Sequence, residues 1–167
     1  REKVKGSCSL MVLTEEGVYA MRDKLGRTPI LIGKSDTGYA LATESSSFTN
    51  LGYVYETELG PGQAVFVTTE GIKEVSAAGK KMQICSFLWV YYGYPSSHYE
   101  GVNVDESRYR CGCALAKYDE SEKAGYDLVA GIPDSGIGHA IGYPNCIHVP
   151  YKRAFVKYTP TWPRSFM

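Results

Sequence analysis

The stretch that most constrains the fold is LVAGIPDSGIGHAIGY, residues 128–143. An apolar run, residues 126–132, ends at Pro-Asp-Ser and passes through glycines into a short helical pattern. Continuous Val, Leu, Ile and Ala are typical of a buried parallel strand. The stretch therefore predicts a strand, a tight turn and a helix, with Asp134 and Ser135 as N-cap candidates.

The predicted helix carries Ile137, Ala140 and Ile141 on one face. In an open α/β sheet, ligands collect where a strand ends and a helix begins, because free N–H groups and the helix dipole favour an anion there. We expect a phosphate. On these residues alone, a turn with a purely structural role fits equally well.

Composition excludes several classes of partner. Lys plus Arg equals Asp plus Glu, 18 of each, so no basic surface for nucleic acid or anionic membrane is expected. There is no apolar run of membrane-spanning length and no signal-peptide pattern, which predicts a cytoplasmic protein. The chain begins at Arg1 rather than at Met, and it ends at Met167 before any residue that would stop a helix or form a turn. We therefore expect a fragment or a processed chain.

The cysteine count is odd, which argues against a disulfide framework. We therefore expect reduced thiols packed in the core, in agreement with a cytosolic location. The five residues concerned are Cys8, Cys85, Cys111, Cys113 and Cys146.

The first half of the chain has the pattern of an antiparallel sheet. Short segments rich in β-branched and aromatic residues alternate with turn residues. The predicted strands are 9–13, 17–22, 29–33, 39–43, 64–68 and 72–75, with hairpin turns at Glu16-Gly17 and Glu70-Gly71. Residues 76–83, SAAGKKMQ, are small and polar and predict a linker.

The second half predicts helix and parallel strand. Residues 104–121 form an amphipathic helix with Asp105 as N-cap, with Cys111, Ala114 and Leu115 near one face, and with Arg108 and Arg110 solvated. Residues 149–156 predict a second parallel strand. The aromatic side chains of 87–92 are expected in a core, because no basic residues separate them. The three histidines, His98, His139 and His148, have no metal-ligand spacing and are expected at the surface or in packing.

Several motifs together carry a resemblance to a known family. GIPDSGIGHAIGY, preceded by CSFLWVYYGYPSS and LGPGQAVFV, resembles the middle of the glutamine phosphoribosylpyrophosphate amidotransferases. MRDKLGRTPI and ATESSSFTNLG stand where the family has segments close to FRDPNGIRPL and ASES. A salt bridge or turn anchor is the preferred role for Arg22, Asp23 and Arg27, since nothing pairs them with a nucleophile.

The resemblance implies a fold in two parts. Residues 1–83 would be the second half of an N-terminal-nucleophile glutaminase sandwich, mostly antiparallel β. Residues 84–167 would be the bridge and the start of a type I phosphoribosyltransferase domain, a parallel α/β fold. The family's nucleophile is an N-terminal cysteine, whereas Cys8 is internal and on a predicted strand, so this chain alone is expected to be inactive.

The implied activity is the first step of de novo purine synthesis, in which phosphoribosylpyrophosphate and glutamine give 5-phosphoribosylamine. The implied substrate-binding residues are Asp134, Ser135, Gly136, Lys157 and Arg164, and Ser135 would contact magnesium. Lys157 and Arg164 belong to KYTPTWPRSFM, which resembles the family's flexible loop. In members with a 4Fe–4S cluster, a cysteine at the position of Cys85 is one ligand; members without a cluster can also carry it, and the other three ligands would lie beyond Met167. Further implied partners are purine nucleotides as inhibitors and further copies of the chain in a homo-oligomer.

Two alternatives stay open. The first is a catalytically inert nucleotide-binding or regulatory relic of the same fold, which the missing nucleophile allows. The second is a different amidotransferase or a stand-alone phosphoribosyltransferase, of which neither half would be complete.

Overall fold

The computed structural model describes residues 3–120 and 125–158 and divides the chain into two compact units. The first unit contains the residues up to Leu88 together with Gly93–Val104. The second contains Trp89–Tyr92 and the residues from Asp105 onward. In the described part of the chain, no helix is long and apolar enough to cross a membrane.

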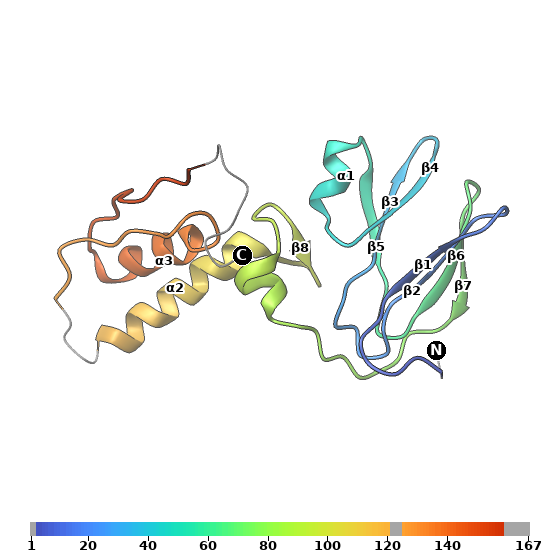
Figure 1. The fold of residues 1–167 in the computed structure, drawn as a ribbon, viewed down its shortest axis with the longest axis horizontal. Coiled ribbons are helices and arrows are strands. Elements are labelled where there is room, and N and C mark those ends of the chain that lie inside the picture. The colour runs from blue at the N-terminus through green and yellow to red at the C-terminus, as the bar shows by residue number, and fades with distance from the viewer. Residues whose placement is uncertain (1–2, 121–124, 159–167) are drawn as a thin grey trace. The chain divides into compact units, whose positions relative to one another are not determined.

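The first unit contains a four-stranded antiparallel sheet in the order β1-β2-β6-β7 (Figure 1). Its strands are β1 (Leu10–Leu13), β2 (Val18–Met21), β6 (Ala64–Val67) and β7 (Ile72–Ser76). The predicted hairpin turns are confirmed, because Thr14 N–H donates to the Gly17 carbonyl at 2.8 Å and Thr68 N–H to the Gly71 carbonyl at 2.9 Å. These four strands correspond to predicted segments, as expected where alternation and turn residues are local signals.

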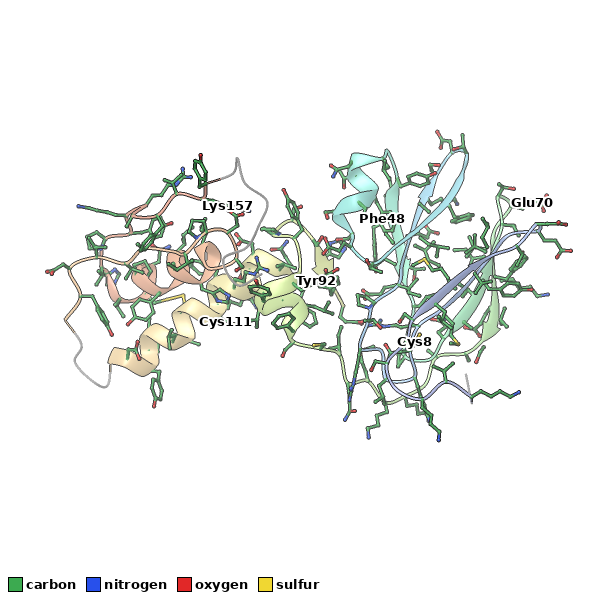
Figure 2. The ribbon with its side chains drawn as sticks, viewed as in Figure 1. Cys8, Phe48, Glu70, Tyr92, Cys111 and Lys157 are labelled. Atoms are coloured by element: carbon green, nitrogen blue, oxygen red, sulfur yellow. A yellow bond between two sulfur atoms is a disulfide. The ribbon has the colours of Figure 1, made fainter. Side chains whose placement is uncertain are left out.

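A second antiparallel sheet has the order β4-β3-β5. It contains β3 (Leu31–Ser35), β4 (Gly38–Ala42) and β5 (Val54–Glu58), and the short helix α1 (Ser46–Asn50) lies between β4 and β5 in the chain. The ring of Phe48 on α1 covers Gly33, where a Cβ would lie 2.7 Å from the ring (Figure 2). Both β3 and β4 correspond to predicted strands, whereas α1 and β5 were not predicted.

The core of the first unit is an apolar cluster to which both sheets contribute. Each member is at most 5% exposed. The cluster consists of Ala20, Ile30, Ile32, Leu59, Val65 and Val67.

The aromatic segment after the linker is not the packed core that was predicted. Residues 77–83 contain no helix or strand, as expected, and a short π-helix, η1 (Leu88–Tyr92), follows. Leu88 is buried, but Phe87 and Tyr92 are 54% and 61% exposed. One turn of helix buries one side of the segment only, so the remaining rings are left at the surface.

After η1, the chain forms a small hairpin. It pairs β8 (His98–Tyr99) with β9 (Val102–Asn103).

The second unit is built on two helices, α2 (Val104–Glu120) and α3 (Ile137–Ile147) (Figure 1). The extent of α2 agrees with the prediction, but Asp105 lies in its first turn rather than at its cap. The two predicted parallel strands are reduced, among the described residues, to a single bridge between Val129 and Tyr151. These two segments pair at this one position only, so neither is a strand in the described part of the chain.

The buried face of α2 differs from the predicted one. Cys111, Ala114 and Leu115 are exposed, and the buried residues recur at every fourth position. These residues are Val104, Arg108, Gly112 and Ala116. The prediction was wrong because it ranked positions by hydrophobicity, whereas this helix faces its neighbour with small residues.

Glycines let α2 and α3 approach backbone to backbone. A Cβ on Gly112 would collide with the carbonyl oxygen of His139, and one on Gly142 would collide with that of Tyr109. The predicted apolar face of α3 was also wrong in part, since Ile141 is exposed while Gly138 and Gly142 are buried.

Close helix packing also corrects the expectation of reduced cysteines. Cys113 of α2 and Cys146 of α3 form a disulfide, with their Cα atoms 5.4 Å apart. Cys8, Cys85 and Cys111 are free thiols, and none is fully buried (Figure 2). An odd count did not exclude one bridge, because the pair is set by the helix contact and not by sequence spacing.

Candidate functional site

The candidate site is the turn of residues 131–137 at the start of α3. Gly136 N–H donates to the Ile132 carbonyl at 3.1 Å, and Ile137 N–H donates to the Asp134 carbonyl at 3.2 Å. Two of the amide groups that were expected to be free for an anion therefore close the turn itself. The peptide bond between Pro133 and Asp134 is cis.

Tight approaches explain the glycines of this turn. A Cβ on Gly136 would lie 2.7 Å from the Ile132 carbonyl oxygen, and one on Gly131 would lie 3.0 Å from the Ile137 Cα. The N-cap of α3 is Gly136, so the prediction that Asp134 or Ser135 caps the helix is wrong. Gly136 has no side chain, and the N-cap makes no side-chain hydrogen bond.

Lys157 comes to this turn from the segment after the parallel bridge (Figure 2). Val129 N–H donates to the Pro150 carbonyl at 2.9 Å and Lys152 N–H donates to the Val129 carbonyl at 2.9 Å, which aligns the two segments. Lys157 Nζ lies 2.8 Å from Asp134 Oδ2, and both side chains are more than half exposed. Two residues predicted for one site, 23 positions apart, are thus brought into contact.

The other predicted site residues are distributed differently. Ser135 lies in the turn, half-buried beside Asp134. Arg164 lies outside the described residues. Cys85 is exposed, and the described residues contain no group of three His, Cys, Asp or Glu side chains placed to hold a metal ion.

Arg108 is a supporting residue that the sequence analysis placed wrongly in solvent. It is 2% exposed, and it donates from Nε to the Trp89 carbonyl at 2.8 Å and from Nη2 to the Tyr91 carbonyl at 3.0 Å. It also lies against α3, because a Cβ on Gly138 would be 3.0 Å from the Arg108 Cβ. Its spacing of four residues from Val104 and Gly112 is the signal that could have placed it on the buried face. Arg110 is 75% exposed, as predicted.

The preferred role for Arg22 and Asp23 is confirmed. The buried Arg22 guanidinium pairs with Glu58 and Glu100, at 3.5 and 2.7 Å. Asp23 accepts hydrogen bonds from Leu25 N–H at 3.1 Å and from Thr28 N–H at 2.8 Å, so it anchors the turn after β2. Burial raises the pKa of the Asp23 carboxyl, but these hydrogen bonds outweigh it and the net shift is downward.

Comparison with known proteins finds relatives of this chain. No family model matches it. It is 32% identical over 155 residues to an amidophosphoribosyltransferase of Bacillus subtilis, covering 92% of this chain and 32% of that protein. It is 31% identical over 157 residues to an amidophosphoribosyltransferase of Archaeoglobus fulgidus, covering 93% of this chain and 34% of that protein.

A solved structure agrees with the sequence matches. Glutamine phosphoribosylpyrophosphate amidotransferase from B. subtilis, complexed with ADP and GMP, superimposes with a TM-score of 0.85 at 29% identity, covering 97% of this chain and 36% of that one. The chain spans about a third of the length of the curated relatives that it matches. In both sequence and fold, the chain is therefore a relative of the amidophosphoribosyltransferases over more than nine-tenths of its length.

Proposed function

We propose that this chain is part of an enzyme that makes 5-phosphoribosylamine from phosphoribosylpyrophosphate and glutamine, the first step of de novo purine synthesis. Residues 1–83 would be part of the glutaminase, and residues 84–167 would be the bridge and part of the phosphoribosyltransferase. The contact between Asp134 and Lys157 carries the proposal, because it joins two residues that resemblance assigned to one site.

This reaction requires a site that binds the departing pyrophosphate. Ammonia forms the new bond to C1 of the ribose, and the C1–O bond breaks with its electron pair leaving on pyrophosphate. Negative charge grows on the leaving group, so cationic and N–H donors lower the barrier. Lys157 would supply the cation at the turn, and Gly136 would shape the turn by allowing its close approach to the Ile132 carbonyl.

Magnesium fits this turn through oxygen donors. Mg²⁺ is commonly held by one or two carboxylates together with substrate phosphates and water. The Ser135 hydroxyl, beside Asp134 in the turn, would be an oxygen ligand of the ion. When bound, magnesium neutralises the charge on the leaving group. A 4Fe–4S cluster in the whole enzyme would take the exposed Cys85 as one of its ligands.

Further partners follow from the same proposal. The B. subtilis neighbour was solved with ADP and GMP. We propose purine nucleotides as inhibitors, glutamine as the second substrate, homo-oligomeric assembly and a cytoplasmic location.

The test is binding of magnesium phosphoribosylpyrophosphate by isothermal titration calorimetry. Lys157→Met and Asp134→Asn are compared with Lys152→Met, a control that removes one positive charge from another exposed lysine of the same segment. A charge-assisted hydrogen bond contributes about 1.5 to 3 kcal/mol, so Lys157→Met should weaken binding about 10- to 100-fold.

The control variant should bind as the parent protein does. If Lys152→Met and Lys157→Met weakened binding equally, the effect would come from the net charge of the protein, and the proposed binding site would be contradicted. Absence of binding in the unsubstituted protein would favour the inert relic.

A further inference from the structure

A polar cavity of about 350 Å³ lies on the first unit, between α1 and the segment that leads into β8. Its volume is within the range of about 300 to 1,000 Å³ typical of small-molecule sites. Residues that line it include Ser45, Thr49, Asn50, Tyr94, Ser96 and His98. None of them belongs to the turn of residues 131–137.

One wall of the cavity is held by a serine and a histidine that are 53 positions apart. The Ser45 Oγ atom accepts the His98 backbone N–H at 2.9 Å and lies 3.0 Å from His98 Nδ1. The His98 ring also meets the Tyr55 ring edge to face, with centroids 5.1 Å apart. The imidazole is therefore fixed from two sides, with Nε2 as its remaining polar atom.

A buried network supports this wall from behind. Ser97 is fully buried, and its Oγ lies 2.8 Å from the Ser46 Oγ. The Glu44 carboxylate accepts the Tyr99 hydroxyl at 3.2 Å. A wall held by its own hydrogen bonds loses little entropy when a ligand arrives.

The groups in the lining select the charge of the ligand. None of the described residues that line the cavity is Lys, Arg, Asp or Glu, so neither an anion nor a cation finds a counter-charge. Hydroxyl, amide and imidazole groups both donate and accept hydrogen bonds, which matches hydroxyl groups on a ligand. The Tyr94 side chain, 61% exposed, adds an aromatic surface for the apolar face of a ring.

We propose that this cavity binds an uncharged hydroxylated ring, either a free sugar or the ribose of a nucleoside. The proposal is independent of the proposed phosphoribosylpyrophosphate site, because the residues involved belong to the other unit.

The test follows chemical shifts of ¹⁵N-labelled protein during titration with D-ribose, ribose 5-phosphate and adenosine. D-Ribose should shift resonances of residues 45–50 and 94–98, and ribose 5-phosphate should bind no more tightly. Adenosine binding at least tenfold tighter than ribose would identify a nucleoside as the source of the ring, and equal affinity would identify a free sugar.

Exposed lining residues allow the test without unfolding the protein. Asn50→Ala and Tyr94→Ala should each weaken binding at least fivefold. Tyr92→Ala is the matched control, because Tyr92 is also 61% exposed but does not line the cavity. No binding of ribose or adenosine, tighter binding of the phosphate ester, or equal loss in the control would overturn the proposal.

Discussion

Arg22 and Glu100 form an ion pair, with 2.7 Å between Nη1 and Oε1. The fully buried guanidinium also donates to the Leu59 carbonyl at 2.5 Å and the Gly26 carbonyl at 2.7 Å. Glu100 N–H donates to Glu58 Oε2 at 3.0 Å. One arginine thus ties the turn of the β8–β9 hairpin to β5, and it faces two carboxylates with one positive charge.

This arrangement makes the stability of the first unit depend on pH. Burial, together with the charge of Glu100, raises the pKa of the Glu58 carboxyl from 4.5 to about 7, against the opposing effect of Arg22. Between these values the folded state binds more protons than the unfolded state. The contribution of Glu58 to stability is therefore complete below pH 4.5 and is lost as the pH rises through 7.

We expect the free energy of unfolding to fall by about 1 to 3 kcal/mol across this window. Glu58→Gln should flatten the dependence, whereas Glu56→Gln, at an exposed position of the same strand, should leave it unchanged. Urea unfolding at a series of pH values measures both. The Asp23 carboxyl has the opposite effect on stability. Its pKa is lowered from 3.8 in the folded state, so its contribution to stability is lost as the pH falls below that value. If the free energy of unfolding instead rose from pH 4.5 to 7, and by the same amount in the parent protein and in Glu58→Gln, the raised pKa of Glu58 would be contradicted.

Arg108 and Arg110 should respond differently to the same substitution. Arg108→Met removes two hydrogen bonds from a buried guanidinium to the Trp89 and Tyr91 carbonyls, and should destabilise the second unit by about 2 to 4 kcal/mol. Arg110→Met removes an exposed ion pair with Glu106 and should cost less than about 0.5 kcal/mol. Chemical denaturation compares them, and similar losses would show that Arg108 is solvated after all.

The disulfide between Cys113 and Cys146 gives a prediction about thiol counts. Alkylation of the denatured, unreduced protein should label three cysteines, and alkylation after reduction should label all five. The bridge joins residues 33 positions apart, so reduction should lower stability by about 4 kcal/mol by the chain-entropy argument. Cys111→Ser, which removes a free thiol, should leave stability unchanged. Five labelled thiols before reduction would exclude the bridge.

Gly112→Ala should destabilise the protein, although replacing a helical glycine with alanine usually stabilises it. At an exposed helix position, alanine stabilises by about 0.8 to 1 kcal/mol relative to glycine. Here the added methyl group collides with the His139 carbonyl, so we expect a loss of about 1 to 3 kcal/mol. Cys111→Ala at the exposed neighbouring position should be nearly neutral. Thermal melting decides, and a stabilised Gly112→Ala would mean that the two helices do not pack this closely.

Ser135→Ala separates ligand binding from helix capping. Gly136 rather than Ser135 is the N-cap of α3, so the melting temperature should not change. If Ser135 contacts the metal-pyrophosphate unit, affinity for magnesium phosphoribosylpyrophosphate should fall about tenfold, corresponding to about 1.4 kcal/mol. A lower melting temperature with unaltered affinity would remove Ser135 from the binding site.

The antiparallel strands of the first unit were predictable because their signals are local. β1, β2, β3, β4, β6 and β7 combine β-branched or aromatic residues with turn residues at their ends. The β-branched and aromatic residues Val54, Tyr55 and Thr57 were a usable signal for β5 that was missed. The extent of α2 was predicted for the same reason, since helix periodicity depends on residues a few positions apart.

The contacts that complete the molecule depend on residues far apart in the chain. Arg108 and Arg110 are both cationic residues of one helix, and only the neighbouring segments decide that one is buried and the other solvated. The disulfide of Cys113 and the pairing of His98 with Ser45 likewise required segments that no local pattern connects.

The sequence by itself determined six strands of the first unit, the extent of α2, the candidate turn with Asp134, Ser135 and Gly136, and the likeness to one family, because these rest on short-range order and composition. Tertiary structure alone decided which faces are buried, that Lys157 meets Asp134, and that α2 and α3 touch through glycines. The physical reason is that burial and pairing are properties of two surfaces in contact, and one segment specifies only its own surface.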